Sequence, residues 1–181
     1  GRKAVQLSQE RKPDVVIMDI SMPDLNGMEA TRQMLKELPH LKVIALSMHS
    51  DRRFILGMFQ AGASGFLLKD CAFDELASAI DTVVANQPYL SPTIAGTVIQ
   101  DFVQGTPATE SAATAVLTAR EREVLQLLAE GWSTSQIGSH LHVSVKTVET
   151  HRRRIMEKLG LRGIAELTKY AIREGLTSLE P

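Results

Sequence analysis

The chain has 181 residues, of which 44% are hydrophobic and 23% are charged, and its formal net charge is −1. This composition is ordinary for a globular protein with one large domain or two small ones, and the near-zero charge by itself indicates no particular partner. The single cysteine, Cys71, excludes an intramolecular disulfide framework and favours a reducing, cytoplasmic location. No apolar run reaches the length of a membrane-spanning helix.

Strands and helices alternate through the first half of the chain. The run Val15–Met18, bounded by Pro13 and Asp19, predicts a short strand buried on both faces. Short strands separated by helices predict βαβ units and a parallel sheet. We predict strands over 14–19, 42–47 and 64–69, and helices over 2–10, 27–38, 51–60 and 72–86.

Polar side chains follow each of the three predicted strands directly. These are Asp19, Ser47 and Lys69. Parallel strands place their carboxyl ends at one edge of the sheet, so a carboxylate, a hydroxyl and an ammonium group are expected to converge there. Asp19 alone is readily explained as the cap of a turn. The three groups together instead favour a phosphoryl site, with the carboxylate as acceptor and the cation as its counter-charge.

The composition changes after residue 87. Residues 88–116 contain two prolines, a short apolar helix pattern and then a stretch of small polar residues, which predicts a linker. Residues 117–181 contain signals for four helices, including Thr118 with Glu121 and Ser133 with Gln136 as two capping boxes. A short helix, a tight turn and a longer helix over 145–159 predict a helix-turn-helix in an all-α domain.

The helix over 145–159 has two different faces. Val148, Ile155 and Leu159 recur at helical spacing and are expected to pack inward. Residues 143–173 contain eight Lys and Arg against three Asp and Glu, a local excess of five positive charges in a nearly neutral chain. An arginine-rich face is often only solvated. On the second helix of a helix-turn-helix, however, it favours the DNA major groove.

The motifs "MDISMPDLNG", "ALS" and "GFLLKD" resemble the receiver domain of bacterial two-component response regulators of the NarL/FixJ type. The resemblance covers residues 1–87 and implies a flavodoxin-like parallel sheet. It implies Asp19 as the phosphorylated residue, Ser47, Phe66 and Lys69 as switch residues, and a sensor histidine kinase as partner. It also implies Mg²⁺, with Asp19 and the backbone carbonyl of Ser21 among its ligands.

The resemblance begins at the helix over 2–10, so the chain is expected to lack the receiver's first strands and their acidic Mg²⁺ ligands. This chain is therefore expected to be a poor acceptor from small-molecule phosphodonors and to bind Mg²⁺ weakly or not at all.

The segment from Leu117 to Leu161 resembles the LuxR-type DNA-binding domain that ends NarL/FixJ regulators. The resemblance implies that Glu149, Thr150 and Arg153 face base edges, with Glu149 either accepting a bond from cytosine or only orienting Arg153. It implies phosphate contacts for Lys146, Thr147 and Arg154, and a homodimer on double-stranded DNA.

Three functions compete on these observations. The first is a transcriptional response regulator controlled by phosphorylation. The second is a phosphorylation-independent DNA-binding regulator with a non-sensing receiver. The third is an aspartate-dependent phosphohydrolase. It is the weakest, because such enzymes resemble Asp-x-Asp where this chain has Asp19-Ile20-Ser21.

Overall fold

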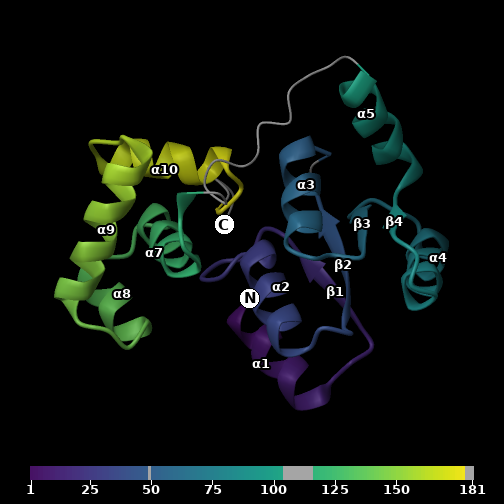
Figure 1. The fold of residues 1–181 in the computed structure, drawn as a ribbon, viewed down its shortest axis with the longest axis horizontal. Coiled ribbons are helices and arrows are strands. Elements are labelled where there is room, and N and C mark those ends of the chain that lie inside the picture. Colours follow the sequence, from purple (N-terminus) through teal and green to yellow (C-terminus); the bar gives the residue numbers. More distant parts are fainter. Residues whose placement is uncertain (49, 104–115, 178–181) are drawn as a thin grey trace. The chain divides into compact units, whose positions relative to one another are not determined.

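The computed structural model describes residues 1–48, 50–103 and 116–177. These residues form two compact units, the first containing α1 to α5 with the sheet and the second containing α7 to α10 (Figure 1). Part of the predicted linker, residues 104–115, lies outside the described residues.

The first unit is a four-stranded parallel sheet with strand order β1-β2-β3-β4 and helices between the strands. The predicted alternation of strands and helices is confirmed, with element ends within two residues of the predicted ones. The strands are β1 Val15–Asp19, β2 Lys42–Ser47, β3 Gly65–Leu68 and β4 Tyr89–Leu90, and the helices are α1 Arg2–Arg11, α2 Gly27–Glu37, α3 Arg52–Gln60, α4 Phe73–Val84 and α5 Pro92–Val103.

The sheet differs from the sequence prediction in two places. Strand β4 was not predicted, because two residues between two prolines give no measurable alternation. The prediction that the first strand is buried on both faces is wrong, since the side chain of Ile17 is 42% exposed. The reason is position: within the described residues β1 is an edge strand that pairs only with β2.

The core of this unit lies on the two central strands. Val43, Ile44 and Ala45 of β2 and Phe66 and Leu67 of β3 have no exposed surface. Helices pack on the faces of a parallel sheet, so residues on both faces of its central strands are buried. This explains why these two strands are continuous apolar runs. Helix α4 covers part of it through Ala79 and Val83.

The second unit is the predicted four-helix domain. Its helices are α7 Ala119–Ala129, α8 Thr134–His140, α9 Val145–Leu159 and α10 Ile164–Arg173. Both capping boxes are present, so Thr118 and Ser133 fix the starts of α7 and α8. Helix α9 begins after Ser144, whose hydroxyl accepts the Thr147 N–H, and ends at Gly160 with a φ of 66°. The helix-turn-helix formed by α8 and α9 is confirmed.

The packing of α9 onto the unit follows its sequence pattern. Val148 and Ile155 are fully buried and Leu159 is partly buried against the same cluster. The cluster also contains Val124, Leu125 and other apolar residues of α7. One face of α9 is thus committed to the core, which leaves the opposite face to solvent.

Gly27 is required by a close approach of two backbone segments. A Cβ at this position would lie 2.1 Å from the Asp19 carbonyl oxygen and 2.9 Å from the Ile20 Cα. Backbone atoms cannot give way as the end of a flexible side chain can. The Gly27 N–H also donates to the Ile20 carbonyl at 2.9 Å, closing the loop after Asp19.

We therefore expect Gly27→Ala to destabilise the first unit by about 2–3 kcal/mol through overpacking. Gly96→Ala is the matched control, because its added Cβ would meet no atom within 4 Å beyond its chain neighbours and the backbone of its own helix. Urea unfolding followed by far-ultraviolet circular dichroism measures the loss. Fluorescence of Trp132, the chain's one tryptophan, reports the second unit separately. Equal stability of the two variants would contradict the expected clash.

Candidate functional site

Two of the three groups predicted to converge at the sheet edge, Asp19 and Lys69, are in contact. The Lys69 ammonium lies 2.6 Å from Oδ2 of Asp19, although 50 residues separate them in sequence. The other carboxylate oxygen, Oδ1, accepts the Ser21 N–H at 3.2 Å. Asp19 therefore both caps its turn and faces a cation. Its side chain is 34% exposed, so the carboxylate is accessible to a reagent.

Ser47 and Phe66 lie in the sheet beside this edge. The register pairs Asp19 with Leu46 and Ser47 with Leu68, so the strands end at neighbouring positions. Ser47 is 4% exposed and Phe66 has no exposed surface. The structure brings Asp19 and Lys69 into contact, while Ser47 and Phe66 are buried within the strands that carry them.

The residues present do not by themselves form a metal centre. Within the described part of the chain, no group of three or more His, Cys, Asp or Glu side chains is placed to hold a metal ion. Asp19 and the Ser21 carbonyl are at most two ligands, whereas Mg²⁺ requires a near-octahedral set of oxygens.

The exposed face of α9 carries the predicted DNA-contacting residues. Lys146, Glu149, Arg153 and Arg154 are exposed, and Thr147 and Thr150 are partly exposed. The Thr150 hydroxyl donates to the Lys146 carbonyl at 2.8 Å, and the Thr147 hydroxyl lies 2.8 Å from that of Ser144. The two threonine hydroxyls are therefore engaged locally, while the charged side chains extend from the helix.

Ion pairs along α9 differ from the arrangement considered from the sequence. Glu149 does not pair with Arg153 but lies 3.9 Å from the Arg152 guanidinium. Arg153 instead pairs with Glu157, with 3.8 Å between Nε and Oε1. Glu149 and Glu157 each lie four residues from Arg153, so helical spacing allows Arg153 to pair with either carboxylate. The side-chain rotamers determine which of the two pairs forms. Glu157 was not predicted as part of the site.

Helix α9 is tied to the start of α7 by a shielded ion pair. The Lys158 ammonium lies 2.7 Å from Oε2 of Glu121, whose side chain is 4% exposed. The same oxygen accepts the Thr118 N–H at 2.8 Å in the capping box. Burial alone raises the pKa of Glu121, but hydrogen bonds from Lys158 and Thr118 outweigh it and hold the pKa below its ordinary value.

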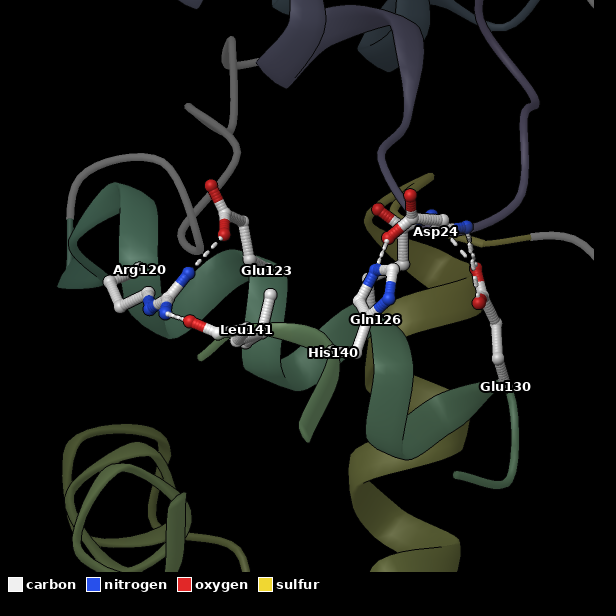
Figure 2. A network of polar contacts seen from close by, with 7 residues as sticks. All are labelled: Asp24, Arg120, Glu123, Gln126, Glu130, His140 and Leu141. Carbon is white, nitrogen blue, oxygen red and sulfur yellow. Dashed lines mark hydrogen bonds and ion pairs between the residues drawn. The ribbon is translucent and has the colours of Figure 1, made fainter. Parts of the chain in front are cut away.

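The turn between α8 and α9 is held by Arg120. Its guanidinium donates to the Leu141 carbonyl at 2.8 Å and to the Glu123 carboxylate at 2.8 Å (Figure 2). Leu141 is the residue that ends α8. Arg120 and Leu141 are 21 residues apart in sequence, so no local pattern reveals their contact.

The two units match two families. The description "Response regulator receiver domain" matches residues 1–81, and "Bacterial regulatory proteins, luxR family" matches residues 115–171. The chain is 35% identical over 180 residues to the oxygen regulatory protein NreC of Staphylococcus carnosus strain TM300, covering 97% of this chain and 83% of that protein. It is 34% identical to the transcriptional regulatory protein DegU of Brevibacillus brevis, covering 97% and 80%.

The chain belongs to the LuxR-type response regulators. It is a DNA-binding transcriptional regulator of a two-component system, in which a receiver domain is joined to a LuxR-type DNA-binding domain. The family is therefore one of DNA-binding regulators rather than of phosphohydrolases.

Solved structures agree with this assignment. A LuxR-family response regulator from Aurantimonas sp. SI85-9A1 is 34% identical with a TM-score of 0.54, covering 56% of this chain and 73% of that chain. RcsB of Salmonella enterica serovar Typhimurium has a TM-score of 0.55 at 22% identity, covering 94% of this chain and 80% of that chain, and supports the fold.

Within the described residues, no helix has both the length and the apolar character needed to cross a membrane.

The Glu121–Lys158 pair gives this regulator's DNA-binding domain a pH-dependent stability. Because the folded-state pKa of Glu121 is lowered, the pair stabilises above the ordinary value of 4.5 and is lost as pH falls through the folded pKa. Lys158→Met is expected to lower the free energy of unfolding of the DNA-binding domain by about 1–2 kcal/mol at pH 7. Loss of a fully buried ion pair would cost more, but Lys158 is partly exposed to solvent. The cost should shrink as the pH falls below 4.5 and through the lowered folded-state pKa of Glu121.

Urea unfolding followed by Trp132 fluorescence at several pH values measures this difference. Lys169→Met, which changes an exposed lysine of α10, is the control for loss of one positive charge. A pH-independent difference between Lys158→Met and the wild type would show that the pair is not its source.

Proposed function

We propose that Asp19 is the phosphoryl acceptor of the receiver. The observation that carries the proposal is the Lys69 ammonium 2.6 Å from Oδ2 of an accessible carboxylate at the carboxyl end of a parallel strand. The carboxylate attacks the phosphorus of a donor, forms an acyl phosphate and expels the donor's leaving group. Lys69 is placed to offset the charge of the added phosphoryl group.

The switch residues of the proposal are Ser47, Phe66 and Lys69. The family mechanism requires a hydroxyl and an ammonium that turn toward the phosphoryl group and an aromatic ring that turns inward. Ser47 and Phe66 lie in adjacent strands beside the acceptor edge, which supports their assignment. Receiver domains of the family bind Mg²⁺ for phosphorylation, and Mg²⁺ binding stays a prediction for this chain.

The proposal extends to how α9 reads DNA. Glu149, Thr150 and Arg153 would lie against base edges, with Arg153 bidentate to guanine, and Lys146, Thr147 and Arg154 would contact phosphates. Exposure of the charged members on the face of α9 opposite Val148 and Ile155 supports this division.

The proposed partners follow from the same function. They are a sensor histidine kinase that supplies the phosphoryl group, and a second copy of the chain on an inverted-repeat DNA site. We assign residues 1–87 to the receiver, 88–116 to the linker and 117–181 to the DNA-binding domain, acting in the cytoplasm without enzymatic turnover of their own.

Phosphorylation is tested by incubating the chain with acetyl phosphate and Mg²⁺ and mapping any adduct by tandem mass spectrometry. Every phosphoryl group found is expected on Asp19, and Asp19→Asn should remove it, because an amide is not a nucleophile of this kind. Asp14→Asn, at the other end of β1, is the control and should retain the adduct. An adduct mapped to another residue of the wild-type chain, or an equal adduct on Asp19→Asn, overturns the assignment.

Base readout is tested by binding titrations with a 24-base-pair duplex selected from a random pool by the full chain. Arg153→Ala should cost about 1–3 kcal/mol and relax preference at one base pair. Lys146→Ala should weaken all sequences alike and flatten the log–log salt slope by about 0.9. Unchanged affinity and preference in Arg153→Ala would show that α9 is oriented differently.

A further inference from the structure

We propose that Glu157 is a specificity-determining residue of the DNA interface, which holds Arg153 away from phosphates when no matching base is present. This rests on the proposed readout by Arg153. The carboxylate stands one turn beyond Arg153 on the same face of α9, and Oε1 lies 3.8 Å from Nε. Both side chains are largely exposed, at 72% for Arg153 and 67% for Glu157, so either is free to meet DNA.

Helix stability explains a carboxylate at this position only in small part, because an exposed i, i+4 ion pair contributes about 0.2–0.5 kcal/mol. Glu157 lies two residues before the end of α9 at Leu159. The carboxyl-terminal turn of a helix carries partial negative charge, which disfavours a carboxylate. Glu157 is also outside the core cluster, unlike its neighbours Ile155 and Met156, which belong to it or pack against it. The residue therefore contributes little to folding.

The effect on DNA follows from competition for one guanidinium. On non-matching DNA, Arg153 lacks a guanine and would turn to the nearest phosphate, a contact that strengthens binding to every sequence. Glu157 competes for Arg153 and repels the phosphate itself. On matching DNA, a bidentate guanine contact supplies two directed hydrogen bonds. The carboxylate therefore weakens binding to non-matching DNA more than binding to the matching site.

The surroundings give Arg153 room to change partner. A surface hollow of about 630 Å³ is lined by both members of the pair, by Arg152 with its own partner Glu149, by Arg162, and by the apolar side chains of Met156 and Leu161. Additional arginines beside the pair would each strengthen phosphate binding. Glu157, the carboxylate paired with Arg153, limits that sequence-independent attraction at Arg153.

The test compares Glu157→Gln with Glu166→Gln in the full chain. Glu166 accepts the Arg162 N–H at 2.6 Å through its side chain, a bond that the amide oxygen of glutamine can retain. Both variants remove one negative charge from the same domain, so their difference isolates the local pair. Anisotropy titrations use the selected 24-base-pair duplex and a duplex with the same bases in shuffled order, over a range of salt concentrations.

Glu157→Gln is expected to tighten binding to the shuffled duplex about twofold to fivefold and to steepen its salt slope by about 0.9, with little change on the selected duplex. Glu166→Gln should leave the ratio of the two affinities unchanged. In an Arg153→Ala background, Glu157→Gln should no longer alter the ratio. Equal tightening on both duplexes, or equal effects of the two glutamine variants, overturns the proposal.

The outcome also separates this inference from the readout on which it rests. Loss of preference in Arg153→Ala together with no effect of Glu157→Gln rejects only the role of Glu157. No effect of Arg153→Ala on either duplex rejects the readout itself.

Discussion

The parallel pairing of β1, β2 and β3 is the constraint on which the receiver depends. Its register places Asp19 beside Leu46 and Ser47 beside Leu68, and brings Lys69 within 2.6 Å of Asp19. A slip of one residue would reverse the facing of every side chain in a strand and separate these groups. The apolar residues that fix the register, such as Ile44 and Leu67, therefore also fix the geometry of the acceptor. Core packing and the proposed chemistry are two consequences of one hydrogen-bonded ladder.

The DNA-binding domain depends on polar contacts made by α7. Arg120 fixes the turn that follows α8, and Glu121 anchors the carboxyl-terminal end of α9 through Lys158. Apolar packing of Val148 and Ile155 sets the depth of α9, but such contacts tolerate sliding more readily than directed hydrogen bonds. A helix that reads base edges must be held to within about half an ångström. We infer that these two links to α7 supply that precision.

Local patterns in the sequence were sufficient for most of the fold. Capping residues such as Thr118 and Ser133 predicted where α7 and α8 begin, and the apolar spacing in α9 predicted which of its faces packs inward. The parallel sheet was predicted from the alternation of short strands with helices. The contact of Asp19 with Lys69 was predicted because parallel strands place their carboxyl ends at the same edge of the sheet. The exposure of Ile17 could not be predicted, because burial on both faces depends on which strands lie beside β1. The Lys158–Glu121 contact spans 37 residues and depends on helix packing, which a single sequence does not encode in any local pattern.

The energetics of the proposed switch place its origin inside the sheet edge rather than in the exposed ion pair. Moving a two-state equilibrium from 1:99 to 99:1 requires about 5.5 kcal/mol of differential stabilisation. An ion pair as accessible as Lys69–Asp19 contributes about 0–1 kcal/mol, and a phosphoryl group in the same place interacts through the same solvent. Ser47 is 4% exposed, and a shielded hydroxyl that changes hydrogen-bond partner alters the energy by about 1–3 kcal/mol. Phe66 is already fully buried, so turning further inward gains no additional burial in this conformation. The buried hydroxyl, acting together with the strand contacts around it, is therefore the stronger source of any response to the charge added at Asp19.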